Sequence, residues 1–162
     1  MAYGGTGGLP PGRGRPRNGA AARESRNVAP MTGERDLRTL LRGMRPELNP
    51  GRFVFTTLRG VETPPGVTPV VTVVEPEGLT LVLPEAQAVE SRLAYDFVAG
   101  WITLRVHSSL DAVGLTAAVS LALTDAGVSC NVVAGHHHDH LFVPYERAAE
   151  AVRVLEALAR ES

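Results

Sequence analysis

The chain has 162 residues, 44% of them hydrophobic, which is enough for one globular domain or for two small ones that share a core. Its 16 basic residues are all arginine, and the absence of lysine excludes Schiff-base chemistry on a lysine and a P-loop phosphate site. No apolar run approaches the roughly 20 residues that a membrane-spanning helix needs, and the N-terminus has no hydrophobic stretch typical of a signal peptide. Together with a single cysteine, Cys130, these features predict a cytoplasmic protein.

Residues 1–33 are expected to form a disordered tail, because they are rich in Gly, Pro, Arg and Ala and show no apolar periodicity. Within them, Arg13–Arg17 resembles an AT-hook, whose Arg-Gly-Arg-Pro core binds the minor groove of A·T-rich DNA. The match is short and occurs once, and the rest of the chain is mildly acidic, so nucleic acid is not expected as a partner. Met1 and Met31 both stay open as the start of the protein.

The first half of the chain predicts one helix, three strands and a weakly helical segment. Apolar residues at 37, 40, 41 and 44 form a helical stripe that ends near Pro46. Runs rich in β-branched residues, separated by turns rich in proline and glycine, indicate the strands. The expected elements are a helix over 36–44, strands over 53–58, 70–74 and 79–83, and a weak helix over 84–95.

The second half has a clearer pattern. Residues 101–106 alternate apolar and polar side chains, as a half-buried strand does. A helical stripe follows and stops at Gly127, and Pro144 precedes a last amphipathic helix. The expected elements are strands over 101–106, 128–134 and 140–143, and helices over 111–126 and 145–160.

The two halves repeat one layout. Superposing Pro84 on Pro144 matches residues 81–83 with 141–143, and the first copy lacks the helix between its first two strands. A β-α-β-β-α unit present twice predicts an α+β fold of two ferredoxin-like modules with antiparallel sheets, the first without a full middle helix. We expect the modules to span residues 34–95 and 96–162.

The run from His107 to Ala117 is the most informative part of the sequence. It follows a strand and contains two serines and an aspartate, so we expect Ser109 or Asp111 to cap the helix that begins there. Gly114 in the first helical turn would cost about 1 kcal/mol relative to alanine, which is reasonable where another backbone or a ligand approaches closely. A capped helix N-terminus beside a glycine favours a site for a small carboxylate.

Four motifs of the second half resemble a family of small bacterial proteins built from two ACT-type domains. These motifs are His107–Leu110, Ala112–Ala118, Cys130–Gly135 and His138–Pro144. The resemblance extends over residues 34–160 and relates the chain to the amino-acid-sensing ACT pairs of aspartokinases and of the animal arginine sensor. It implies a regulatory, non-catalytic protein that binds an amino acid or a related effector, with a loop glycine at an interface between ACT modules. A homodimer formed through these modules is one arrangement that the resemblance suggests.

The expected ligand site combines the loop at 107–115 with two later segments. Loop hydroxyls would assist the helix amides in binding a carboxylate, the strand at 131–133 would add amide or backbone contacts, and Asp139 is the candidate for an ammonium group. The expected ligand-binding residues are Ser108, Ser109, Val113, Gly114, Leu115, Asn131, Val133, His138 and Asp139.

The histidine-rich run His136–His140 offers metal binding as a less favoured alternative. On an extended chain His136, His138 and His140 share one side, so two or three imidazoles could reach one ion. The run falls at a hairpin turn, however, and no cysteine or glutamate elsewhere completes an obvious ligand set. No metal or other cofactor is therefore expected.

An enzymatic function is not expected. His107, Ser108 and Asp139 could be drawn as a hydrolase triad, but adjacent Ser and His in a capping loop are poor evidence for one, and the sequence has no Gly-x-Ser-x-Gly elbow. Cys130 lies in an apolar run and is expected to pack within a strand. The competing hypothesis is an interaction module that joins a partner through a sheet edge or a helix face without any ligand.

Overall fold

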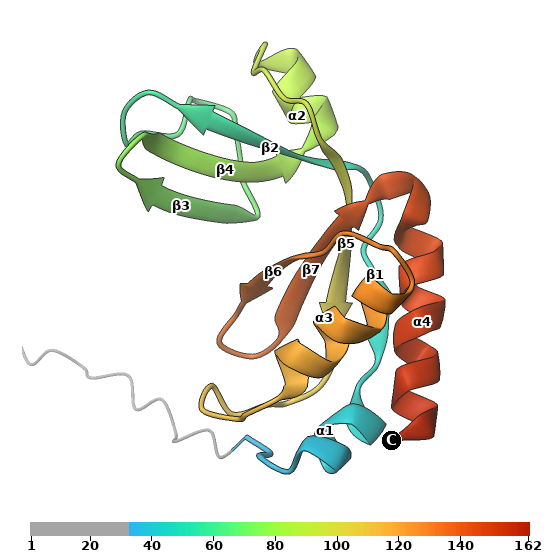
Figure 1. Cartoon of the computed structure of the whole chain (residues 1–162). Coiled ribbons are helices and arrows are strands. Elements are labelled where there is room, and N and C mark those ends of the chain that lie inside the picture. Colours follow the sequence, from blue (N-terminus) through green and yellow to red (C-terminus); the bar gives the residue numbers. More distant parts are fainter. Residues whose placement is uncertain (1–32) are drawn as a thin grey trace, which may run out of the picture. The chain divides into compact units, whose positions relative to one another are not determined.

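Four helices, one 3-10 turn and seven strands lie along residues 33–162, the part of the chain that the computed structural model describes (Figure 1). The helices are α1 (Leu37–Gly43), α2 (Glu85–Glu90), α3 (Leu115–Asp125) and α4 (Ala148–Glu161), the last preceded by a 3-10 turn, η1 (Tyr145–Arg147). The strands are β1 (Pro46–Leu48), β2 (Phe53–Leu58), β3 (Val71–Glu75), β4 (Gly78–Pro84), β5 (Val98–Leu104), β6 (Asn131–Ala134) and β7 (Asp139–Pro144). None of these helices combines the length and hydropathy that a membrane crossing requires.

Three of the sequence-based expectations concern residues 1–32, which lie outside the described residues. They are the disorder expected for the tail, of which only Gly33 is described, the AT-hook-like segment Arg13–Arg17, and the choice between Met1 and Met31 as the start of the protein.

All seven strands belong to one sheet, in which every neighbouring pair is antiparallel. The strand order is β3-β4-β2-β5-β7-β6, with β1 also paired to β5. One edge of β5 pairs with β7, while its other edge pairs with β1 near Ile102 and with β2 at Val98 and Ala99. The segment from β1 to β2 thus runs along β5 and then leaves it to pair with β4.

The pairing produces two ferredoxin-like sets of four strands that share β5. One set is β5-β2-β4-β3, and the other is β1-β5-β7-β6. The connection from β2 to β3 contains no helix, whereas the equivalent connection from β5 to β6 contains α3. The prediction of two antiparallel ferredoxin-like modules, the first without its middle helix, is confirmed.

Some element boundaries differ from those expected. β5 begins at Val98 rather than at 101, β6 begins at Asn131 rather than at 128, and α3 begins at Leu115 rather than at 111. The short strand β1 was not expected at all, because Pro46 and two polar neighbours have no strand pattern of their own. Tertiary pairing with Ile102, Thr103 and Leu104 supplies the missing stabilisation.

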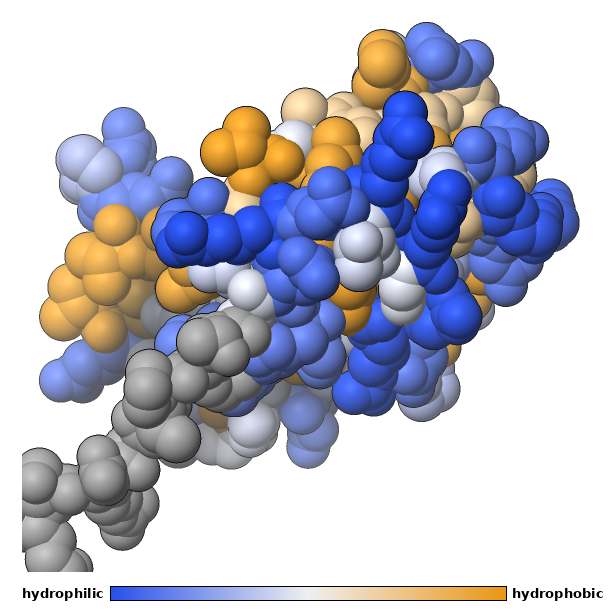
Figure 2. All heavy atoms as spheres, turned by 90° about the horizontal axis from the view of Figure 1, so that it is seen from below, coloured by the Kyte–Doolittle hydropathy of each residue, from blue (hydrophilic) through white to orange (hydrophobic). Residues whose placement is uncertain are grey.

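Helix α1 begins at a side-chain cap, as its sequence predicts. Asp36 Oδ1 accepts from the backbone N–H of Thr39 at 2.9 Å, and this hydrogen bond holds the pKa of Asp36 below its ordinary value. Arg38, Arg42 and Arg45 are exposed at this end of the domain. Figure 2, which views the molecule from below the orientation of Figure 1, shows hydrophilic side chains covering most of this face.

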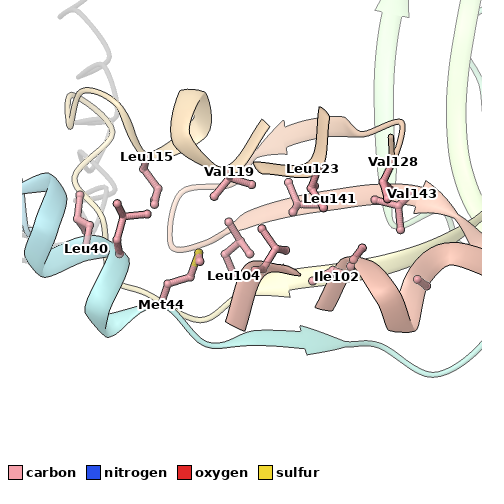
Figure 3. Close-up of a cluster of buried hydrophobic side chains, with 14 residues drawn as sticks. Leu40, Met44, Ile102, Leu104, Leu115, Val119, Leu123, Val128, Leu141 and Val143 are labelled. Carbon is pink, nitrogen blue, oxygen red and sulfur yellow. The ribbon is translucent and has the colours of Figure 1, made fainter. Parts of the chain in front are cut away.

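The larger core lies between the second strand set and helices α1, α3 and α4. Side chains of α1 and α3 point toward those of β5 and β7 (Figure 3). Its fully buried large residues are Leu40, Met44, Ile102, Leu104, Leu123, Leu141 and Leu155. Each buried leucine or isoleucine contributes about 1.5–3 kcal/mol relative to an exposed position, so this cluster is the main source of stability in the second module.

Two smaller clusters complete the interior. One lies under α2 and contains Val54, Leu79, Leu81 and Leu83 together with Val67 from the long β2–β3 connection. The other is aromatic and lies on the sheet face away from the helices, around Phe142 and Phe53. The rings of Phe53 and Trp101 meet edge to face at 5.2 Å, and those of Phe55 and Phe142 do so at 5.5 Å. This cluster joins strands of both modules.

Candidate functional site

The loop that follows β5 is held in place by the first described segment of the chain. Glu34 forms a parallel bridge with Ser108: its N–H donates to the carbonyl of His107 at 3.0 Å, and its own carbonyl accepts from Ser109 N–H at 3.1 Å. A Cβ on Gly33 would lie 2.3 Å from Ser109 N, so this approach of two backbones requires glycine. The segment at 33–36 therefore becomes part of the predicted site region, which no local pattern in these residues indicates.

A hollow of about 260 Å³ lies at this junction. It is lined by His107, Ser108, Ser109, Leu110, Asp111 and His136. The residues that line this space of small-molecule size carry two hydroxyls, two imidazoles, one carboxylate and one apolar side chain. The structure brings together the predicted residues Ser108 and Ser109 with three polar groups that were not in the predicted set.

Asp111 is the acidic group of this hollow, and it is kept ionised. The Ser109 hydroxyl donates to its carboxylate, and Arg35 forms an ion pair with it. The hydrogen bond from Ser109, assisted by the charge of Arg35, lowers the pKa of Asp111. Both partners of the ion pair are exposed, so the pair itself adds little stability and can rearrange around a ligand.

The start of α3 differs from the prediction in a way that changes the role of Gly114. No side chain caps the helix, so neither Ser109 nor Asp111 does so, and the expectation of a capped start near 111 is wrong. Gly114 is not in the first turn; it is the N-cap residue, with φ +104°. The left-handed backbone favours glycine, and a Cβ there would lie 3.0 Å from Leu37 Cδ2, so the Leu37 side chain of α1 would have to shift slightly to admit a larger residue.

The remaining predicted site residues are spread along β6 and the β6–β7 hairpin. Asn131 pairs with Phe142 and donates to its carbonyl at 3.4 Å, and Val133 contacts the aromatic cluster. The end of β6 near the hollow is Ala134, about 10 Å along the strand from Asn131. Asn131 and Val133 do not line the hollow, and neither do Val113 and Leu115.

His138 and Asp139 lie at the hairpin but outside the hollow. His138 Nδ1 lies 3.2 Å from the carbonyl of Val106, which ties the hairpin to the end of β5. Asp139 is half-buried, and this burial raises the pKa of its carboxyl group, opposed by the charges of His140 and His138. Within one protomer, Asp139 is thus less suited to bind an ammonium group than Asp111.

The histidines cluster but do not form a metal centre in the described part of the chain. The rings of His136 and His137 lie 5.0 Å apart, and those of His107 and His137 lie 6.4 Å apart. Among residues 33–162 no three His, Cys, Asp or Glu side chains are placed to hold one ion.

The hydrolase arrangement does not form either. No hydrogen bond joins the Ser108 hydroxyl to His107 or Asp139 within residues 33–162. Cys130 is half-buried, and burial raises the pKa of its thiol to about 11, which keeps it protonated and poorly nucleophilic.

Sequence reasoning missed a polar chain on the open face of the sheet. Asn49 Nδ2 donates to Thr103 Oγ1 at 2.9 Å, and Trp101 Nε1 donates to His140 Nδ1 at 3.1 Å. The Thr103 hydroxyl lies 3.2 Å from the same His140 nitrogen. The alternation of residues 101–106 could have placed Trp101 and Thr103 on one face, but only the register of β5 with β7 places His140 beside them.

Two ferredoxin-like modules in succession, with a glycine loop after the first strand of the second, define a protein of the ACT-domain class. Two family models, each described as an ACT domain, match residues 32–100 and 97–157. The chain belongs to the ACT-domain family and carries two ACT domains in tandem.

Solved structures agree with this assignment. A Vibrio cholerae protein of unknown function, described as a possible transport protein, is 43% identical, with 76% of this chain and 95% of that chain covered and a TM-score of 0.68.

Two more distant structures share the fold. An Agrobacterium tumefaciens protein is 18% identical, with 72% of this chain and 89% of that chain covered and a TM-score of 0.57. The regulatory subunit of aspartate kinase from Thermus flavus is 10% identical, with 70% of this chain and 96% of that chain covered and a TM-score of 0.54. None of the curated proteins matches the sequence.

Proposed function

We propose that this protein is a non-catalytic regulatory protein that binds a free amino acid or a close relative in the hollow formed by the loop after β5 and His136, beside the segment at 33–36. The observation that carries the proposal is the hollow itself, a space of about 260 Å³ whose lining residues carry an ionised carboxylate, two hydroxyls and two imidazoles. The regulatory role is supported by the two ACT domains and by the shared fold of an aspartate kinase regulatory subunit.

The polar groups of the hollow match a zwitterion. Asp111 would accept the ligand's ammonium group, and Arg35, which already lies against Asp111, would turn to the ligand's carboxylate. Ser108 would donate to the same carboxylate, the Ser109 hydroxyl would keep its hydrogen bond to Asp111, and Leu110 would contact an apolar side chain. Since the exposed Arg35–Asp111 pair contributes at most about 1 kcal/mol, inserting a ligand between its partners has a low cost.

Binding there would act on the placement of the segment at 33–36. This segment leads into α1, which packs on the second strand set, and it is bridged to the loop after β5, so a ligand at the loop would favour one placement of the segment over others. We further propose a cytoplasmic location, in keeping with the half-buried reduced thiol of Cys130.

A thermal-shift screen of the twenty amino acids on the full chain tests this proposal. A ligand that binds only the folded state, present at a concentration of about 100 times its Kd, should raise the Tm by roughly 5–10 °C. Asp111→Asn should weaken binding about tenfold or more, whereas the matched control Asp125→Asn, at the far end of α3, should bind as the parent does. A screen without any Tm shift, or equal loss in both variants, would contradict the proposal.

The second candidate is a ligand-free interaction module, favoured by the apolar side chains that the same loop exposes. Leu110 is 68% exposed and Val113 is 84% exposed. In this case a second copy would cover them, and light scattering of the parent against a Leu110→Ser/Val113→Ser variant would show a dimer converted to a monomer. Unchanged mass in the variant would remove this candidate.

A further inference from the structure

A second hollow lies where the two modules meet, at the opposite end of β5 from the site proposed above. It measures about 390 Å³ and is formed by the turn before β2, the start of α2 and the residue that follows β7. The wall is mostly apolar, from Pro50, Phe53, Pro84, Ala86 and Tyr145. Pro84 and Tyr145 come from the corresponding strand-to-helix junctions of the two modules, so both modules contribute to one space.

One guanidinium group is fixed at this hollow. Arg52 Nε donates to Glu85 Oε2 at 2.5 Å, and the guanidinium lies 4.5 Å from the centroid of the Tyr145 ring. Tyr95 OH donates to the other oxygen of Glu85 at 3.2 Å, so that the carboxylate is itself held. A guanidinium restrained on two sides loses little side-chain entropy when it binds a further group.

The terminal nitrogens of Arg52 make no hydrogen bond within residues 33–162, since its bond to Glu85 uses Nε. An arginine presents five N–H donors, and its two terminal nitrogens form a fork that matches a carboxylate. The hydrogen bond to Glu85 raises the pKa of Arg52, so the guanidinium stays charged. Each oxygen of Glu85 already accepts a hydrogen bond, whereas the terminal nitrogens of Arg52 have no acceptor within residues 33–162, so Arg52 is the group with the greater unused capacity to recognise a ligand.

We infer that this hollow is a binding site for a monocarboxylate with an apolar body, whose carboxylate pairs with the terminal nitrogens of Arg52 while its body packs against the proline and aromatic wall. The site is independent of the proposed function, since it shares no residue with the hollow around Asp111. A ligand here would contact both modules and hold their junction, because η1 follows the last strand of the second module and α2 follows the last hairpin of the first.

Phenylpropionate is a suitable probe, with phenylpropylamine and phenylpropanol as partners of the same skeleton. We expect isothermal titration of the full chain to show one phenylpropionate per chain and about tenfold or more weaker binding of the amine and the alcohol. Equal or tighter binding of the amine would assign recognition to Glu85 and Glu146, which also lies near Arg52, and would overturn the inference.

Variants test the geometry. Arg52→Gln should weaken phenylpropionate binding about tenfold or more, while Arg105→Gln, which breaks the comparable exposed pair with Glu47, should leave it unchanged. Ala86→Leu should fill the hollow and abolish binding, while Ala149→Leu on the exposed surface of α4 should not.

Two outcomes besides those above would overturn the inference. One is binding that persists in Ala86→Leu, and the other is binding that is lost in Asp111→Asn, since both would place the probe outside this hollow. A failed amino-acid screen with intact phenylpropionate binding would refute only the function proposed for the hollow around Asp111.

Discussion

At the scale of single residues, His140 shows how the open face of the sheet selects a protonation state. An indole N–H can only donate, so the bond from Trp101 makes His140 Nδ1 an acceptor and places the proton of the neutral ring on Nε2. Burial, together with the charge of His138, lowers the pKa of His140 below 6.5, while Asp139 opposes this shift. The folded protein therefore favours a neutral ring with one defined tautomer.

We expect Trp101→Phe to raise the pKa of His140, because it removes a donor that stabilises the neutral ring. Histidine NMR titrations of parent and variant measure the difference directly. The unfolded chain binds this proton more readily than the folded protein does. The contribution of His140 to the free energy of unfolding is therefore complete above about pH 6.5, and it decreases as the pH falls through the pKa of His140 in the folded protein. An unchanged pKa in the variant would show that the hydrogen bond from Trp101 does not stabilise the neutral ring over the charged one.

Gly33 offers a second test at this scale. Gly33→Ala places a Cβ against the backbone of Ser109, so we expect it to detach the segment at 33–36 and to increase hydrogen exchange at Ser109 N–H. Gly43→Ala is the matched control, because its Cβ would meet only Val106 at 3.8 Å and alanine favours the helix. Equal exchange in both variants would mean that the contact is not needed to hold the loop.

At the scale of elements, α3 illustrates how burial differs between neighbouring positions of one helix. Leu123 faces the sheet and is fully buried, while Leu121 is 61% exposed. The start of this helix is set by tertiary contacts, because Gly114 must adopt a left-handed backbone against Leu37. Capping rules that use only local sequence place the start too early.

We expect Leu123→Ala to reduce the free energy of unfolding by about 2–5 kcal/mol, because it leaves a cavity between α3 and the sheet. Leu121→Ala should change it by less than about 0.5 kcal/mol, because the side chain is already exposed to water. Chemical denaturation of both variants measures the two values. Similar losses would show that the face of α3 carrying Leu121 is covered in solution.

At the scale of residues 33–162 taken together, the shared strand β5 couples the two modules. It pairs with β2 of the first module and with β7 of the second, and the aromatic cluster around Phe142 contains residues of both. Separate unfolding of either module would expose this cluster. The two ACT domains should therefore behave as one cooperative unit.

We expect calorimetry and circular dichroism to report a single transition at the same Tm. Leu81→Ala in the first module and Leu123→Ala in the second should both lower the Tm of that one transition. Two resolved transitions, each responding to only one of the variants, would mean that the modules unfold independently.

The class of fold and the layout of its elements could be predicted from local patterns in the amino-acid sequence. Hydrophobic periodicity and the repeat that relates Pro84 to Pro144 were enough for two antiparallel ferredoxin-like modules, because side-chain period and turn residues are local properties. The same local signals placed the loop at 107–114 and its serines at a candidate site, and Ser108 and Ser109 do line a hollow there.

Which residues share that hollow depends on contacts between distant parts of the chain. Arg35 and Asp111 meet because the backbone at Gly33 and Glu34 packs on the loop, and Asn131 is excluded because the register of β6 with β7 sets it along the strand. The junction hollow around Arg52 likewise depends on β5 serving both modules. These contacts join positions far apart in the chain, and a local pattern carries no information about such distances.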